Sequence, residues 1–153
     1  MIQESTIERV LARLEAGDED FAIEIQDFAH GQPNLATYLT NEENDILNEA
    51  ERTLLLFGAI VIYQSVLEER TEPDPVSEEI IGSAEEENYL LLPEKGSFRD
   101  RLSPLFASSK EEELLAFAED LVVGEAEEDG ITKEAREPLF VALKTVVDVL
   151  TAG

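Results

Sequence analysis

The apolar positions of this chain recur at the spacing of an amphipathic helix from its first residues onward. In the segment 4–16 they fall at i, i+3, i+4 and i+7, on Ile7, Val10, Leu11 and Leu14. This spacing predicts a first helix, which Gly17 ends. A second helix is predicted for 18–30, and we expect these two helices to form an antiparallel hairpin.

The longest apolar run, at 54–63, lies inside a segment that we predict to be helical from about 42 to 70. From 54 to 62 this segment has no polar face, and a helix that is apolar all round is surrounded by other helices. We therefore expect it to form a long central helix, in which Gly58 lets a neighbour approach closely. A buried β-strand is the alternative for so short an apolar run. The Glu-rich flanks and the lack of a second strand-like segment favour the helix.

Two prolines, Pro73 and Pro75, interrupt the helical pattern after the central segment. Proline breaks a helix and biases the residue before it toward an extended backbone. We therefore expect an internal linker near 71–76. We interpret it as a connection within one helical domain that spans 1–153.

Helices are predicted beyond the linker at about 77–92, 109–123 and 132–151. One side of the first of them is formed by Ile80, Ala84, Asn88 and Leu91. The last has the cleanest apolar stripe and is expected to pack on the central helix, with Pro138 causing a kink or a late start. The segment 94–109 is the least regular, and we assign no helix to it. These patterns predict an all-α, single-domain bundle of about six helices around a long central hydrophobic helix.

The net charge of −25 indicates what kind of surface this fold has. The chain has 36 Asp and Glu against 11 Lys and Arg, while its 43% of hydrophobic residues is enough for a folded core. Such a field repels nucleic acid and anionic membranes and favours cationic partners. We therefore expect no direct nucleic-acid binding. We also expect no membrane span, because a ten-residue apolar run is half the length that a bilayer requires.

Few residues carry catalytic or metal-binding chemistry. The chain has no cysteine and one histidine, His30, whose position at a predicted helix end suits a structural role. Its glycines match neither a dinucleotide-binding nor a P-loop spacing. The acidic loop at 125–130 departs from a calcium-binding EF-hand, whose last ligand would fall on Arg136. We predict no catalytic, cofactor-binding or metal-ligating residue, and no cofactor.

Four residues form the one local concentration of positive charge next to an aromatic side chain. They are Lys95, Phe98, Arg99 and Arg101. We predict a candidate interaction patch here, for an anionic ligand or a neighbouring subunit. The alternative is that these cations neutralise acidic helices beside them, since surface ion pairs form readily.

The sequence favours a non-enzymatic, acidic, cytoplasmic helical protein that acts through protein–protein interaction. The partner would be another protein or a second copy in a homodimer. The alternative is an acidic immunity-type or DNA-mimic inhibitor of a basic nuclease or DNA-binding protein, which charge alone suggests. An enzyme that uses two carboxylates stays open, because two Glu side chains in a cleft suffice for acid–base chemistry. The cytoplasmic location follows from the absence of cysteine and of a signal-peptide pattern at the first residues.

Overall fold

The protein folds into eight α-helices in the computed structural model, which describes residues 1–16, 21–40, 47–123, 132 and 134–151. The helices are α1 (Glu4–Glu15), α2 (Phe21–Gly31), α3 (Pro33–Leu39), α4 (Glu49–Glu69), α5 (Glu78–Leu91), α6 (Phe98–Ala107), α7 (Glu112–Val123) and α8 (Arg136–Thr151). The described residues contain no strand, so the all-α prediction is confirmed and the β-strand alternative for the apolar run is wrong.

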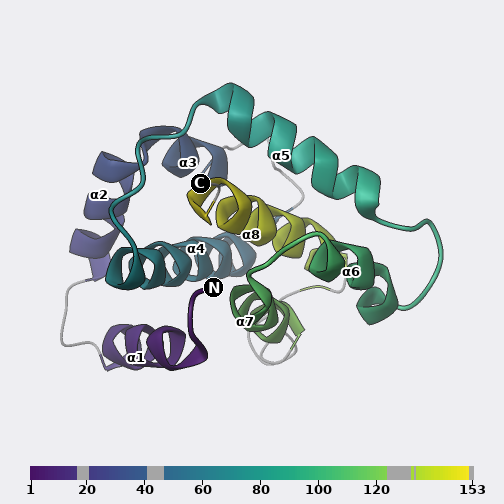
Figure 1. The fold of residues 1–153 in the computed structure, drawn as a ribbon, viewed down its shortest axis with the longest axis horizontal. Helices are drawn as coiled ribbons and strands as arrows, with labels where there is room; N and C mark the ends of the chain where they lie inside the picture. The colour runs from purple at the N-terminus through teal and green to yellow at the C-terminus, as the bar shows by residue number, and fades with distance from the viewer. Residues whose placement is uncertain (17–20, 41–46, 124–131, 133, 152–153) are drawn as a thin grey trace.

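The centre of the bundle is a pair of helices, α4 and α8, which lie side by side in the middle of Figure 1. Every residue of α8 from Leu139 to Val147 is buried, and so is every residue of α4 from Gly58 to Tyr63. The remaining helices surround this pair: α1, α2 and α7 contact α4, while α5 and α7 contact α8. The predicted contact between the last helix and the central one is confirmed, but α8 is as central as α4.

The helix α4 is long and apolar enough, by length and composition alone, to cross a membrane, with a mean hydropathy of 1.4. In the fold, 56% of the 18-residue window of α4 that has this hydropathy is buried inside the bundle. The buried core helix of a globular protein meets the same length and hydropathy criteria.

The start of α4 is set by a capping box. The Asn48 side chain accepts a hydrogen bond from the Glu51 amide, and the Glu51 carboxylate accepts one from the Asn48 amide, both at 2.8 Å. This reciprocal pair satisfies two of the amides that a helix N-terminus leaves without partners. The prediction that this helix begins near 42 is therefore wrong, since the helix begins at Glu49; the segment 41–46 lies outside the described residues.

Three other expectations need correction. The first two helices do not form the predicted hairpin, because α1 packs on α4 and α7 whereas α2 packs on α3 and α4. On α5 the buried positions are Ile81 and Asn88, while Ile80 and Leu91 of the predicted side are exposed. The segment without an assigned helix contains α6, whose N-cap Ser97 accepts a hydrogen bond from the Asp100 amide.

The two predictions that rest on prolines, a late start of the last helix and a linker near 71–76, agree with the structure. The helix α8 starts late, at Arg136, so that Pro138 lies in its first turn, where the missing amide costs little. The segment 71–76 has no helix, and the buried Gln32 side chain holds it by hydrogen bonds to the Pro73 and Asp74 carbonyls and from the Val76 amide.

Glu51 also joins the start of α4 to the residues before α8. Its second carboxylate oxygen accepts hydrogen bonds at 2.8 Å from the amide and from the hydroxyl of Thr132. Burial of the carboxyl raises its pKa, but the hydrogen bonds from Asn48 and Thr132 outweigh burial and hold the pKa below its ordinary value. A carboxyl with a lowered pKa in the folded state stabilises the fold at neutral pH.

We predict that Glu51→Gln lowers the free energy of unfolding by about 2 kcal/mol at pH 7, because an amide nitrogen replaces an oxygen that faces N–H donors. The stability that the ionised form contributes is lost as pH falls through the lowered pKa. The difference between the wild type and the variant should therefore shrink below about pH 4. Urea unfolding at a series of pH values measures it, and a difference that stays constant down to pH 3 would contradict the role of the charge.

Gly58 lies where α4 meets α7 and α8. A Cβ atom at this position would lie 2.7 Å from the Leu121 Cδ2 atom and 2.9 Å from the Leu143 Cδ2 atom, and both leucines are buried. A Cβ atom added at Gly82, in the interior of α5, would have no atom within 4 Å apart from the backbone of its own helix. The predicted close approach at Gly58 is therefore present.

We predict opposite effects of alanine at these two helix-interior glycines. Gly82→Ala should raise the free energy of unfolding by about 0.5–1 kcal/mol through helix propensity alone. Gly58→Ala should lower it by about 1 kcal/mol, because overpacking exceeds the same gain. Urea midpoints of the two variants test this, and a stabilised Gly58→Ala protein would show that the contact between α4, α7 and α8 can relax.

Candidate functional site

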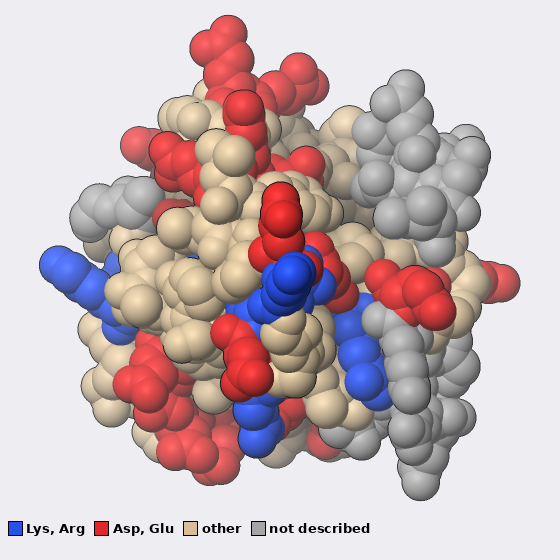
Figure 2. Space-filling view, turned by 90° about the vertical axis from the view of Figure 1, so that its right-hand side faces the viewer, with Lys and Arg blue, Asp and Glu red and all other residues tan. Residues whose placement is uncertain are grey.

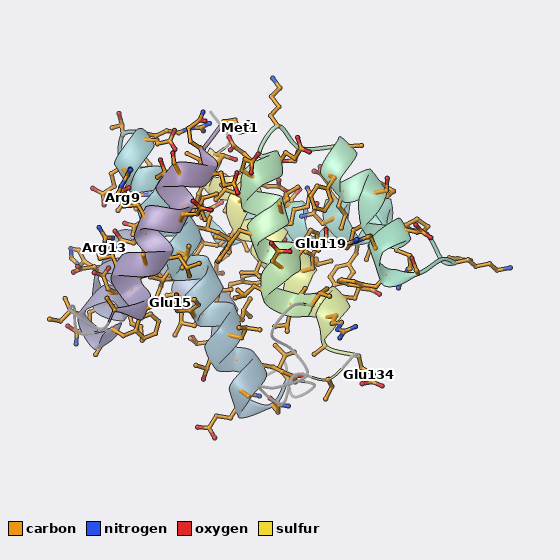
Figure 3. The ribbon with its side chains drawn as sticks, turned by 90° about the horizontal axis from the view of Figure 1, so that it is seen from below. Met1, Arg9, Arg13, Glu15, Glu119 and Glu134 are labelled. Atoms are coloured by element: carbon orange, nitrogen blue, oxygen red, sulfur yellow. The ribbon has the colours of Figure 1, made fainter. Side chains whose placement is uncertain are left out.

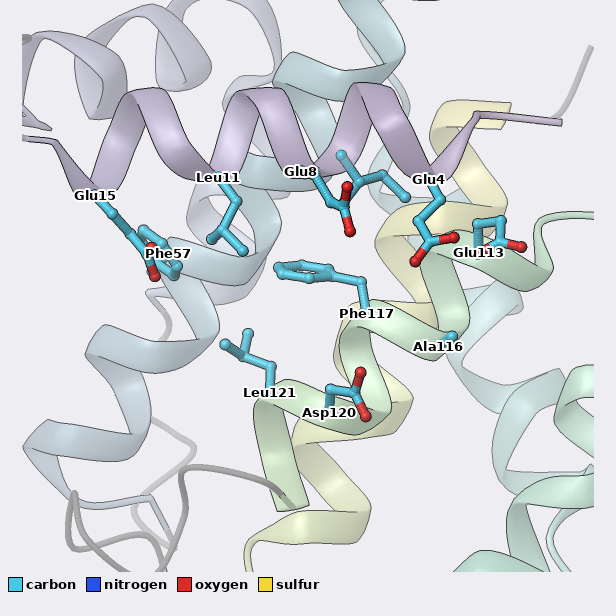
Figure 4. Close-up of a pocket in the computed structure, with 11 residues that line it drawn as sticks. Glu4, Glu8, Leu11, Glu15, Phe57, Glu113, Ala116, Phe117, Asp120 and Leu121 are labelled. Carbon is cyan, nitrogen blue, oxygen red and sulfur yellow. The ribbon is translucent and has the colours of Figure 1, made fainter.

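A groove between α1 and α7 is the feature of this surface with the clearest binding chemistry. Figure 4 shows α1 along one side and α7 along the other, with side chains of both helices directed into the space between them. The lining side chains follow helical spacing on each wall and comprise Glu4, Ile7, Glu8, Leu11 and Glu15 of α1, Phe57 of α4, and Glu113, Ala116, Phe117, Asp120 and Leu121 of α7. The groove therefore has two helical walls, and the single residue from α4 lies at one end of it.

The inner surface of the groove is apolar. Phe117 points from α7 toward α1 and lies between Leu11 and the end of the groove that Glu4 marks (Figure 4). Phe57 closes the opposite end beside Glu15 and, like Phe117 and Leu11, is only partly buried. Partly buried aromatic and leucine side chains leave apolar surface for another molecule to cover.

The rim of the groove is acidic on both sides. Five carboxylates line it, from Glu4, Glu8 and Glu15 on α1 and from Glu113 and Asp120 on α7, and none of the described lining residues is Lys or Arg. Carboxylates held around an apolar surface of low dielectric attract cations more strongly than they would on an open surface.

The two cations of α1 lie on the far side of that helix. Figure 3 shows Arg9 and Arg13 directed away from α7. Arg9 forms an ion pair of 3.0 Å with Glu68 at the end of α4, and Arg13 lies 3.6 Å from the same carboxylate. The helix α1 thus separates its charges, with arginines toward α4 and carboxylates toward the groove.

The segment before α1 fixes one end of the groove. The Ile2 amide donates a hydrogen bond of 2.8 Å to the Glu111 carboxylate, which directly precedes α7 and also pairs with Arg70 at 2.8 Å. The Gln3 amide donates to Glu69 of α4. These bonds hold the start of α1 close to the start of α7, and the two helices diverge from that end in Figure 4.

The groove volume of about 240 Å³ indicates what kind of ligand fits. Pockets that enclose a whole small molecule measure about 300–1,000 Å³. This groove is smaller, so it suits a few side chains of a larger partner. Within the described residues, no group of three or more His, Asp and Glu side chains is placed to hold a metal ion, so the rim carboxylates surround the groove without converging.

The predicted patch lies on α6 and on the turn before it. Arg99 pairs with Glu119 of α7 at 2.9 Å, and Arg101 pairs with Glu137 of α8 at 2.5 Å. Lys95 is exposed, and Phe98 packs partly against the core. Figure 2 faces this side of the molecule, where Lys and Arg side chains lie among carboxylates. The structure brings the four residues into one region, and it joins both arginines to acidic helices, as the alternative interpretation describes.

A buried polar network lies beneath α5. The ammonium group of Lys144 on α8, which is 2% exposed, donates hydrogen bonds to the side chains of Asn88 at 2.7 Å and Asp148 at 2.8 Å. Tyr38 of α3 donates to Glu85 of α5, and burial followed by this contact raises the Tyr38 pKa. These bonds fix α3, α5 and α8 to one another.

Among the described residues, the buried carboxylates that bear on acid–base chemistry lie at three different junctions. Glu51 and Glu111 accept the hydrogen bonds described above, and Glu24 accepts one of 2.7 Å from Gln64. Each of these carboxylates accepts at least one hydrogen bond from a donor within the fold. His30 lies exposed in the last turn of α2, the position that its predicted structural role requires.

The groove is not evident from the sequence, because its walls are about a hundred residues apart in the chain. A signal was nevertheless present in α1, where Glu4, Glu8 and Glu15 share one face and the arginines the opposite face. Comparison of the chain with protein-family models, with curated proteins and with solved structures gave no match.

Proposed function

We propose that this protein acts by binding a basic segment of a partner protein in the groove between α1 and α7. The observation that carries the proposal is the combination of a partly exposed apolar base with five carboxylates and no cation in the lining. Apolar contact supplies affinity at the centre of an interface, while charged groups at its rim select the partner and speed its approach.

The distribution of cations favours a partner that is a different protein. Within the part of the chain that the structure describes, several cations form ion pairs, among them Arg9, Arg13, Arg70, Arg99, Arg101 and Lys144. A second copy would bring another net charge of −25 to an acidic groove. Like charges across an interface are unfavourable, so a homodimer through this groove is disfavoured.

Inhibition of a basic nuclease or DNA-binding protein is a specialised form of the same proposal. Its partner would present a basic surface, and the carboxylates on both walls of the groove would contact it. A surface that only imitates the phosphates of DNA has no need of Phe57, Leu11 and Phe117 between its charges. These side chains favour a partner segment that carries both apolar and basic residues.

The groove is tested by reversing charge on its rim. Glu8→Lys/Asp120→Lys should weaken binding of a basic, apolar-containing probe peptide of about 12 residues by about tenfold, because two attractions become repulsions. Glu86→Lys/Glu94→Lys is the matched control, since it changes the net charge equally at exposed positions outside the groove. Calorimetric titration in about 50 mM and about 300 mM salt measures the affinities.

An equal loss of affinity in the two double variants would show that the probe responds to net charge alone. No detectable binding of the probe to the wild type in low salt would also refute the proposal.

A further inference from the structure

The walls of the groove restrict the conformation of whatever binds there. Both walls are helices, and backbone amides and carbonyls in a helix interior are already paired within the helix. An extended peptide binds a protein edge mainly by pairing its own backbone with free strand groups. The groove offers only side chains, so an extended segment would bury peptide groups against Leu11 and Phe117 without partners, which is costly.

An occupant that satisfies its own backbone hydrogen bonds avoids this cost. An α-helix does so along its whole length, and it presents apolar side chains on one face at i, i+3, i+4 and i+7. The distance along α1 from Glu4 to Glu15 corresponds to about 16 Å at 1.5 Å per residue. A helix of about three turns matches this length, and its apolar side chains would enter the space around Phe117.

The charges define the two flanks of such a helix. Carboxylates line the groove from α1 and from α7, so an occupant between them meets negative charge on both sides of its apolar stripe. Lys or Arg on both flanks complements that arrangement, and the stems of these side chains also cover apolar surface. An occupant with one basic flank would leave the carboxylates of the other wall without partners.

We propose that the occupant of the α1–α7 groove is a basic amphipathic α-helix of about three turns in a partner protein, with Lys or Arg on both sides of its apolar face. This inference rests on the proposed function and adds the conformation and the pattern of the partner segment. It requires that the order of residues in the segment, and not its composition alone, determines affinity.

Two peptides of identical Lys and Leu composition test the proposal. In one, leucines recur at the helical period, and in the other they alternate with lysines at the period of a strand. Each is titrated against the full chain below the concentration at which the peptide self-associates, and its far-ultraviolet circular dichroism is recorded free and bound. The helical-period peptide should bind about tenfold more tightly and should gain helix on binding.

Variants of the protein place the binding in the groove. Phe117→Ala should weaken the helical-period peptide by about tenfold. Tyr89→Ala, at an exposed aromatic residue of α5 outside the groove, should leave its affinity unchanged. If Phe117→Ala does not fold, Glu8→Lys/Asp120→Lys tests the groove instead, since both positions are exposed, and it should weaken the same peptide. An equal loss in Tyr89→Ala would remove the assignment to the groove.

The outcomes separate this inference from the proposed function. Equal affinity of the two peptides, tighter binding of the alternating peptide, or binding without a gain of helix overturns the helical occupant and leaves a basic segment in the groove. Absence of binding by both peptides in low salt overturns the proposed function itself.

Discussion

Scarcity of positive charge is the constraint on which the surface of this protein depends. Eleven cations accompany 36 carboxylates, and the ion pairs that they form lie mostly where helices meet. Arg9 and Arg13 join α1 to α4, Arg70 joins the end of α4 to the start of α7, Arg99 joins α6 to α7, and Arg101 joins α6 to α8. Exposed pairs of this kind stabilise a fold by about 1 kcal/mol or less. Their larger consequence is that these cations lie outside the groove, whose lining contains five carboxylates and no Lys or Arg among the described residues.

Stability comes from the apolar contact of α4 with α8, and a few buried polar groups decide how the other helices are placed around that pair. Glu51 ties the start of α4 to Thr132, Gln32 holds the linker, and Glu111 ties the start of α1 to the start of α7. Leaving such a buried acceptor or donor without its partner costs about 1–3 kcal/mol, so each bond selects one arrangement over its neighbours. Glu111 bears most directly on the proposed binding, because it holds the start of α1 at the end from which the two walls of the groove diverge.

Much of the helical structure could be predicted from local pattern. The caps and the apolar period predicted α1, α2, α5 and α8, and the interruption at Pro73 and Pro75 predicted the linker. The helix α6 was missed because Ser97 and Pro104 were interpreted as signs of a loop, although Ser97 is its N-cap. The start of α4 was placed too early because the helical segment was extended back to about 42, whereas the reciprocal hydrogen bonds between Asn48 and Glu51 set the start at Glu49.

The groove could not be predicted in the same way, since nothing in the spacing of α1 or α7 tells which helices become neighbours. Its carboxylates resembled a solvated face, which is the common outcome for Glu on an amphipathic helix. The tertiary structure shows that these carboxylates line the same groove as Phe117 of α7 and Phe57 of α4. They therefore surround an apolar surface and are not simply a solvated helix face. The acidic face of α1 became informative only when its neighbour was known.

The two kinds of acidity in this protein have different physical consequences for binding. The net charge of −25 acts over the whole molecule, so it would attract the proposed basic partner from a distance and raise the association rate, and this attraction weakens as salt screens it. The five groove carboxylates act at contact, where Phe57, Leu11 and Phe117 exclude water and the partner's apolar side chains determine how slowly it leaves. A charge distributed over every face cannot choose among basic proteins, because all of them are attracted. In the proposed binding, selection would therefore come from a place where carboxylates surround an apolar surface of defined shape, as they do in the groove between α1 and α7.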